Sequence, residues 1–201
     1  MSDPTVRYAE RLPAVRPSRL RLHRLQTSWY RLDREPPDKW GWDAFPTPRY
    51  RFDSASGAFR IRYAGDQPRV AMRERFDDLE RIVRASETSL RLVELTGTIQ
   101  VLDLRRDRTL DALGLDDQIN TGRAPGVWIA CHLLADLAHE WFGERCHGIV
   151  YRSRTTPERS ANLAFFARAP LRARSLGPLA EQRELLLDCV AQEGFTVQGW
   201  R

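Results

Sequence analysis

The sequence predicts an α+β fold with a mixed or antiparallel sheet and flanking helices. Three observations lead to this prediction. Strand-like runs occur along most of the chain, helical segments are interspersed among them, and no internal repeat or low-complexity tract is present. An apolar fraction of 42% in 201 residues is enough for one domain with a real core, and 29% charged residues argues against disorder.

The predicted strands are short runs of apolar and β-branched residues. Residues 59–63 show the pattern best, because Phe59, Ile61 and Tyr63 are separated by single arginines, which is typical of a half-buried strand. Two more runs, residues 89–95 and 99–104, lie on either side of Gly97. The other predicted strands are residues 27–35, 148–151, 163–166 and 195–200.

The first predicted helix covers residues 65–85. Asp66 is placed to cap its N-terminus, and Pro68 falls in its first turn, where the missing N–H costs nothing. Apolar residues then recur at helical spacing, which predicts one buried face formed by Met72, Phe76, Leu79 and Val83.

Two more helices are predicted in the second half of the chain. Residues 127–143 give the clearest pattern and end at a glycine, Gly143. The apolar stripe of this helix is Trp128, Cys131, Leu134, Leu137, Ala138 and Trp141. Residues 177–194 also end at a glycine and precede the last predicted strand. Residues 1–27 form a basic, proline-containing lead-in that we expect to be extended or short-helical.

Cysteine usage and the absence of apolar segments bound the compartment. Cys131, Cys146 and Cys189 show no Cys-x-x-Cys spacing, which predicts buried thiols in a reducing cytoplasm rather than disulfides. The N-terminus lacks the apolar region of a secretory signal, and no run of about 18 apolar residues is present to span a membrane. We therefore expect a cytoplasmic protein that does not bind a membrane.

The chain is basic, with a net charge of +5 and a pI of about 9.5. This balance suits a polyanion, a membrane surface or an anionic small ligand. Nearly all of the positive charge comes from arginine, because Lys39 is the only lysine. A nucleic-acid-binding module is therefore one alternative. The arginines are scattered, however, and no basic stripe with interleaved aromatic residues appears, so direct binding of nucleic acid is not expected.

Common catalytic and cofactor motifs are missing. His132, Asp136 and His139 are spaced to share one helix face, which can mimic a metal site or simply form the polar side of the helix. No His-Glu-x-x-His motif accompanies them, so neither a metal nor a cofactor is expected. Ser153 is not in a Gly-x-Ser-x-Gly elbow, and the glycine-rich nucleotide motifs are absent.

A set of short motifs in a fixed order is more informative. The motifs are Arg51-Phe52-Asp53, Tyr63-Ala64, Ala71 with Glu74, Tyr151-Arg152-Ser153 and Asn162-Leu163. In this order they resemble the RES domain family, which is named for an arginine, a glutamate and a serine. The resemblance covers residues 28–167 and leaves residues 168–201 as a C-terminal helix and strand extension packed on the domain. One departure is Tyr50, where the family usually has glycine.

The resemblance implies a fold related to the ADP-ribosyltransferases. It also implies an enzyme that degrades NAD⁺ by cleaving the nicotinamide–ribose bond, with phosphate or water as the acceptor. Such proteins are toxins of toxin–antitoxin pairs, so the expected partners are an Xre-like helix-turn-helix antitoxin and a second copy of the chain. Transfer of ADP-ribose to a macromolecule is the alternative within the same chemistry.

Three residues are expected to be catalytic on this basis. Glu74 lies off the apolar face of its helix, so it is either simply solvated or faces a cleft. In the role that the resemblance implies, it would stabilise the positive charge that develops on the ribose. Arg51 would bind the pyrophosphate with its planar guanidinium. Ser153 would donate a hydrogen bond to a phosphate or ribose oxygen.

The resemblance also suggests substrate-binding residues. Tyr63 would stack on the nicotinamide or adenine ring. Arg31 would bind a second anion, either the pyrophosphate or the attacking phosphate. The remaining members of this expected group are Tyr151, Arg152 and Asn162. In the loop before them, Trp40, Trp42 and Phe45 are expected to serve either as interface anchors or as part of the core.

Overall fold

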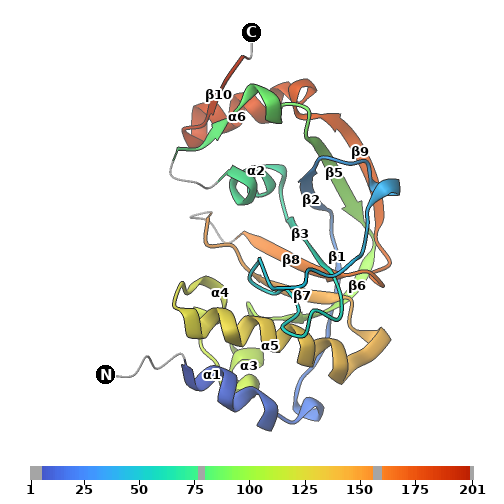
Figure 1. The fold of residues 1–201 in the computed structure, drawn as a ribbon, viewed down its shortest axis with the longest axis vertical. Coiled ribbons are helices and arrows are strands. Elements are labelled where there is room, and N and C mark those ends of the chain that lie inside the picture. The colour runs from blue at the N-terminus through green and yellow to red at the C-terminus, as the bar shows by residue number, and fades with distance from the viewer. Residues whose placement is uncertain (1–5, 77–79, 156–159, 200–201) are drawn as a thin grey trace.

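The computed structural model describes residues 6–76, 80–155 and 160–199. An eight-stranded sheet has the order β1-β6-β7-β8-β3-β2-β5-β9, in which β6 and β7 are parallel and the other neighbours are antiparallel. Figure 1 shows α1, α3, α4 and α5 at one end of the molecule and α2 and α6 at the other, with the strands between and beside them. The α+β prediction with a mixed sheet is confirmed.

The elements have the following bounds. The strands of the large sheet are β1 His23–Gln26, β2 Trp29–Asp33, β3 Ile61–Gly65, β5 Arg91–Thr96, β6 Thr98–Asp103, β7 Gly148–Arg152, β8 Ala161–Phe166 and β9 Arg172–Pro178. A small parallel sheet consists of β4 Ile82–Val83 and β10 Thr196–Val197. The α-helices are α1 Val6–Arg11, α2 Pro68–Phe76, α3 Asp107–Leu113, α4 Gln118–Thr121, α5 Pro125–Phe142 and α6 Arg183–Glu193. Short 3-10 turns cover Leu12–Ala14, Pro17–Arg19, Pro37–Lys39, Ala85–Glu87, Gly143–Arg145 and Leu179–Glu181.

The large sheet is curled. Strands β5 and β6 follow each other with only Gly97 between them, yet β5 is next to one edge of the sheet and β6 is next to the other. The sheet must therefore bend until its two ends approach each other. Gly97 permits the bend, because it has φ +157° and an added Cβ would lie 2.5 Å from the Pro170 carbonyl oxygen.

The first predicted helix is shorter in the structure than in the sequence pattern. Helix α2 ends at Phe76, and Leu79 lies outside the described residues. Val83 is not helical but belongs to β4, so this part of the prediction was wrong. Val83 is nevertheless fully buried, in the same cluster as Met72, although it reaches this cluster from a strand that pairs with β10.

The clearest predicted helix is confirmed as α5, and Gly143 ends it with φ +52°. The buried face of α5 is rotated from the predicted stripe: Cys131, Leu134 and Ala138 are buried, but the tryptophans and Leu137 are only partly so. The positions that take their place are Val127, Ala130 and Ala135. The small residues suit a helix that packs closely on both α1 and β7.

The first and last described elements pack on the rest of the fold. Helix α1 packs on α5, and β1 pairs with β6 at an edge of the sheet. At the other end, α6 contacts α2, and Gly194 ends it in the left-handed conformation. The three cysteines are free and buried, as predicted. In the described part of the chain, no helix has the length and apolarity needed to cross a membrane.

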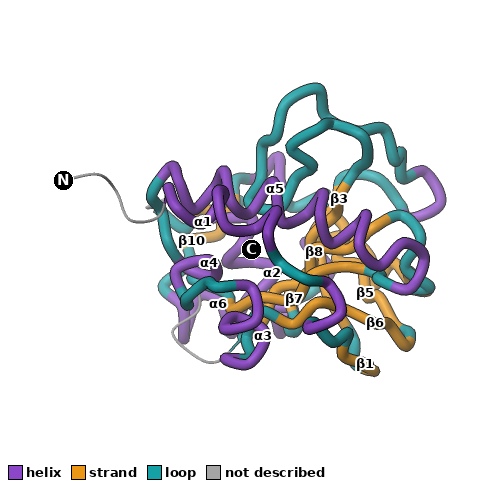
Figure 2. The backbone as a smooth tube through the Cα atoms, turned by 90° about the horizontal axis from the view of Figure 1, so that it is seen from below, coloured by secondary structure: helices purple, strands orange, loops and turns teal. Residues whose placement is uncertain are grey.

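The long loop between β2 and β3 stands out beside β3 and α5 in Figure 2. Its tryptophans, Trp40 and Trp42, are partly buried against the cluster around Val93 and Phe165. The ring of Trp42 meets Phe165 edge to face at 5.9 Å. Core packing therefore accounts for both tryptophans.

Gly65 sets the distance between β3 and α2, and we predict that Gly65→Ala destabilises the protein. A Cβ at Gly65 would lie 2.6 Å from Val70 Cγ1 and 3.1 Å from the Ala71 nitrogen, so the helix would have to shift. Overpacking of this kind costs about 1–3 kcal/mol. Urea unfolding measures the loss. Gly41→Ala is the control, because nothing lies within 4 Å of its added Cβ; equal stability of the two variants would contradict the prediction.

Candidate active site

The candidate site lies where the large sheet splits. Strands β2 and β3 are neighbours, but only Tyr30 and Gly65 form a ladder pair between them. Beyond this pair, β2 forms its ladder pairs with β5, and β3 forms its ladder pairs with β8. A cavity of about 410 Å³ opens at the split. Arg31 lies across the split, where its Nη1 donates to the Tyr63 carbonyl oxygen at 3.0 Å.

Glu74 is the centre of a hydrogen-bond cluster at this cavity. Its Oε1 accepts hydrogen bonds from Ser153 Oγ at 2.8 Å, Thr155 Oγ1 at 2.9 Å and Asn162 Nδ2 at 2.8 Å. Ser153 and Thr155 belong to the loop after β7, Asn162 lies at the start of β8, and Glu74 comes from α2. Within the described residues, Oε2 of Glu74 has no hydrogen-bond partner. One carboxylate oxygen is thus held while the other is available to a ligand.

Three of the predicted site residues therefore meet around one atom. Glu74, Ser153 and Asn162 are far apart in sequence, and the structure brings them together at Oε1. Thr155 was not predicted from the sequence. Its hydroxyl lies 3.1 Å from Ser153 Oγ, and its position two residues after Ser153 in the same loop was the only signal that could have suggested it.

Arg51 is buried beside α4, with 7% of its surface exposed. Its Nη1 donates to the Ile119 carbonyl at 3.2 Å and its Nη2 donates to the Gly122 carbonyl at 2.7 Å. The guanidinium also lies over the Trp128 ring, 5.4 Å from its centroid. Arg51 and Trp128 both line the cavity. The two carbonyls therefore fix a cation at the wall of the site.

Helix α5 holds the loop that contains Arg51. The three polar residues with metal-like spacing on this helix contact the loop and not one another. Their contacts are His132 Nε2 with the Tyr50 carbonyl (3.0 Å), Asp136 with the Ser54 hydroxyl (2.6 Å) and the His139 ring with the Phe59 ring (4.0 Å between centroids). The described residues contain no group of three or more His, Cys, Asp or Glu side chains suited to a metal ion.

Aromatic rings form much of the cavity wall. Tyr63 donates its hydroxyl hydrogen to Asp53 Oδ1 at 2.8 Å, and burial together with Asp53 keeps the pKa of Tyr63 well above its usual value. The Tyr50 ring lies 5.6 Å from the Tyr63 ring and is 52% exposed. Tyr151 is buried against Phe52 at 4.8 Å, and burial raises its pKa as well. Tyr63 and Tyr151 therefore stay neutral, and the rings of the wall offer flat surfaces on which a ligand ring can stack.

The cavity is strongly cationic. Six arginines line it, whereas Glu74 is the only carboxylate among its lining residues in the described part of the chain. The arginines are Arg31, Arg51, Arg60, Arg62, Arg75 and Arg154. Asp33 balances two of them, with its Oδ2 2.6 Å from Arg31 and 3.0 Å from Arg62. Burial lowers the pKa of Arg62 to about 10, so that it still stays protonated at neutral pH.

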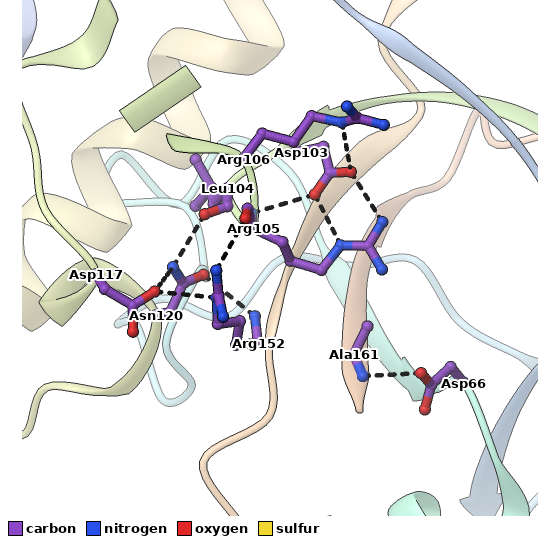
Figure 3. Close-up of polar contacts among 9 residues, drawn as sticks. All are labelled: Asp66, Asp103, Leu104, Arg105, Arg106, Asp117, Asn120, Arg152 and Ala161. Atoms are coloured by element: carbon purple, nitrogen blue, oxygen red, sulfur yellow. Dashed lines mark hydrogen bonds and ion pairs between the residues drawn. The ribbon is translucent and has the colours of Figure 1, made fainter. Parts of the chain in front are cut away.

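Arg152 does not join this site. It lies between Tyr151 and Ser153 on β7, and alternate residues of a strand point to opposite faces. Its Nε lies 3.1 Å from Asp117 Oδ1 and its Nη2 donates to the Arg105 carbonyl at 3.1 Å (Figure 3). Figure 3 shows Arg152 beside Asn120, which accepts a hydrogen bond from its backbone nitrogen. The structure thus gives Arg152 contacts with α4 and the end of β6, outside the cavity lining.

We predict that the fold loses stability as the pH falls below about 6.5. Burial lowers the pKa of His139, and Arg168 Nη1 lies 2.6 Å from its Nε2, which must accept this bond as a neutral ring. The unfolded chain therefore binds a proton at a higher pH than the folded chain, so stability falls as the pH drops through that window. Urea unfolding at pH 7.5 and 5.5 tests this. His139→Gln should show a weaker pH dependence, and an unchanged dependence would contradict the role of His139.

The split, curled sheet and its cationic cavity define an α+β protein with a candidate anion-binding active site. The RES domain family matches residues 21–188, and the chain belongs to this family. Among solved structures, the fold is similar to a chain in the crystal structure of the M. tuberculosis MbcT–MbcA toxin–antitoxin complex. The TM-score is 0.53 at 18% identity, with 90% of this chain and 97% of that chain covered. No curated protein matches the sequence.

Proposed function

We propose that the protein degrades NAD⁺ by cleaving the bond between nicotinamide and ribose. The observation that supports this most is Glu74, which is held through Oε1 beside a cavity lined by six arginines and several aromatic rings. A dinucleotide with a pyrophosphate, two ribose units and two flat rings has the matching chemistry. The family membership and the fold support the same reading.

The residues have distinct roles in the proposed reaction. Breaking the glycosidic bond sends its electron pair to the nicotinamide nitrogen and leaves positive charge on the ribose. The free oxygen of Glu74 stabilises this charge or binds a ribose hydroxyl. Arg51 binds the pyrophosphate, and Tyr63 or Tyr50 stacks on a ring. An oxygen of phosphate or water then forms the new bond to the ribose carbon.

Arg31 and Arg62 are the candidates for the second anion. Both line the cavity at the split, and they share one carboxylate, Asp33. Two cations that share one counter-charge retain positive potential toward the cavity. An attacking phosphate at this point would share the cavity with Glu74, so phosphorolysis is a specific form of the proposal.

The direct test is incubation of the purified protein with NAD⁺, with and without inorganic phosphate, followed by product masses. Phosphorolysis yields nicotinamide and phosphorylated ADP-ribose, whereas hydrolysis yields free ADP-ribose. Modification of an added protein or nucleic acid would instead favour transfer to a macromolecule. Intact NAD⁺ under all conditions, with a folded protein, would refute the proposed activity.

We also propose that the protein is the toxin of a toxin–antitoxin pair. Unrestrained loss of NAD⁺ would kill the host, so the toxin needs a neutralising partner. From the family we infer that this partner is of the helix-turn-helix class and that the toxin assembles as a homodimer. The solved structure of similar fold comes from a toxin–antitoxin complex. Expression of the chain alone should arrest growth and lower cellular NAD⁺, and expression of Glu74→Gln should do neither. Normal growth with normal NAD⁺ would refute this role.

A further inference from the structure

A buried arginine next to Glu74 connects the candidate site to the C-terminal helix. Arg73 is on α2 and is 7% exposed. Its Nη1 donates to the backbone carbonyl of Thr155, in the loop that contains two of the donors to Glu74. Its Nη2 forms an ion pair with the carboxylate of Glu193, the last residue of α6. The two side chains of this pair are 8% and 10% exposed.

Glu193 is itself fixed at the end of α6. Its backbone carbonyl accepts a hydrogen bond from Arg81, which precedes β4. Gly194 then ends the helix in the left-handed conformation, and Phe195 packs edge to face with Phe76 of α2 at 6.5 Å between centroids. The carboxylate is therefore presented to Arg73 by a well-defined helix end.

We infer that Arg73 and Glu193 are positioning residues, through which α6 holds the Ser153–Thr155 loop against Glu74. This inference rests on the proposed function, because it assigns the C-terminal helix a part in the same site. Glu193 orients the guanidinium, and the guanidinium holds the Thr155 carbonyl. The loop then presents Ser153 Oγ and Thr155 Oγ1 to one oxygen of Glu74, at 2.8 and 2.9 Å.

The consequence for catalysis is a matter of orientation. Two of the three donors to Oε1 come from this loop, so a loosened loop lets the carboxylate rotate and misplaces its free oxygen. Small misplacements of a reacting group can cost up to about a hundredfold in rate. Binding of NAD⁺ depends mainly on the arginines and aromatic rings of the cavity wall, which this contact leaves in place.

The test compares two substitutions on α6 in the full chain. Glu193→Gln removes the charge of the pair without a change in size, and Glu184→Gln is the matched control on an exposed position of the same helix. For Glu193→Gln we expect kcat for NAD⁺ cleavage to fall on the order of tenfold or more, with KM changed less than about threefold. Glu184→Gln should leave both constants unchanged.

A double-mutant cycle separates positioning from general destabilisation. If Glu193 acts through Arg73, then Arg73→Gln combined with Glu193→Gln should lower kcat no more than Arg73→Gln alone. The double variant also avoids a buried unpaired charge, so it serves if Glu193→Gln fails to fold. Additive losses in kcat would overturn the inference, as would a folded Glu193→Gln protein with the wild-type kcat.

Hydrogen exchange gives a readout that does not depend on the reaction. Backbone amides of residues 153–155 should exchange faster in Glu193→Gln than in Glu184→Gln. If the wild-type protein does not cleave NAD⁺, the proposed function fails, and this exchange comparison still tests the contact itself. Equal exchange in the two variants would mean that α6 does not hold the loop.

Discussion

Glu74→Gln should lower kcat for NAD⁺ cleavage by a factor of about 10²–10³ and leave the fold intact. Removal of one preorganised transition-state contact costs about 2.7–4 kcal/mol, which corresponds to this factor. The carboxylate stabilises positive charge on the ribose, and a neutral amide cannot do so. The loss should therefore fall mainly on kcat and less on KM, because the charge develops in the transition state.

The structure explains why this substitution should be tolerated. Three donors converge on Oε1, and the carbonyl oxygen of a glutamine can accept from the same donors. The amide nitrogen then takes the place of Oε2, at a position that is exposed to the cavity. We expect the melting temperature to stay within about 2 °C of the wild type.

The control is Glu140→Gln, an isosteric change at an exposed position on α5. It should have wild-type kinetics. A folded Glu74→Gln protein with near-normal kcat would remove Glu74 from the catalytic role, whatever its hydrogen bonds. Loss of activity together with loss of folding would show that the cluster around Oε1 is needed for stability, and kinetics of Glu74→Asp would then separate the two effects.

Local sequence pattern predicted most strands and two of the helices, because each depends on its own periodicity. The apolar repeat of α5 is such a case, and the pattern in residues 59–63 predicted a strand that the structure places at Ile61–Gly65. The half-buried alternation itself was wrong, because Arg62 is buried. The alternation of side chains along β7 also predicts that Arg152 faces away from Tyr151 and Ser153, as the structure shows. A side chain between two site residues on one strand should be expected on the other face.

Other features depend on contacts between distant segments and have no local pattern. The split between β2 and β3 follows from the single ladder pair of Tyr30 with Gly65. Val83, predicted to be helical, lies in a strand because it pairs with β10. The ion pair of Arg73 with Glu193 joins two helices that are far apart in sequence. The order of the family motifs predicted that Glu74 and Ser153 share one site, and the structure places them in contact. Such motifs reflect contacts between distant segments, which local periodicity does not contain.

Arg51→Ala is expected to raise KM for NAD⁺ by tenfold or more, on the order of 1.4 kcal/mol or above. Arg51 offers its planar guanidinium at the cavity wall, and a pyrophosphate accepts two parallel hydrogen bonds from such a group. The contact is present in the ground state as well as the transition state, so KM should change more than kcat. Arg51→Lys should restore only part of the affinity, because an ammonium lacks the fork.

The structure adds a second expected effect of Arg51→Ala. The Gly122 carbonyl loses its charged donor, and the Ile119 carbonyl keeps the hydrogen bond from Cys131 Sγ at 3.4 Å. An unsatisfied buried group costs about 1–3 kcal/mol, so the free energy of unfolding should also fall. Kinetics must therefore be measured at a temperature where denaturant curves show the variant to be folded. Arg49→Ala, at an exposed position two residues earlier that does not line the cavity, is the control.

The two effects can be told apart by their dependence on substrate. If Arg51 binds the pyrophosphate, saturating NAD⁺ should restore most of the rate of the folded Arg51→Ala protein, and NAD⁺ should raise its melting temperature less than that of the wild type. If Arg51 only supports α4, the two proteins should gain equal thermal stability from NAD⁺. An unchanged KM would contradict the pyrophosphate role, and Arg31, which lines the same cavity beside Asp33, would become the better candidate.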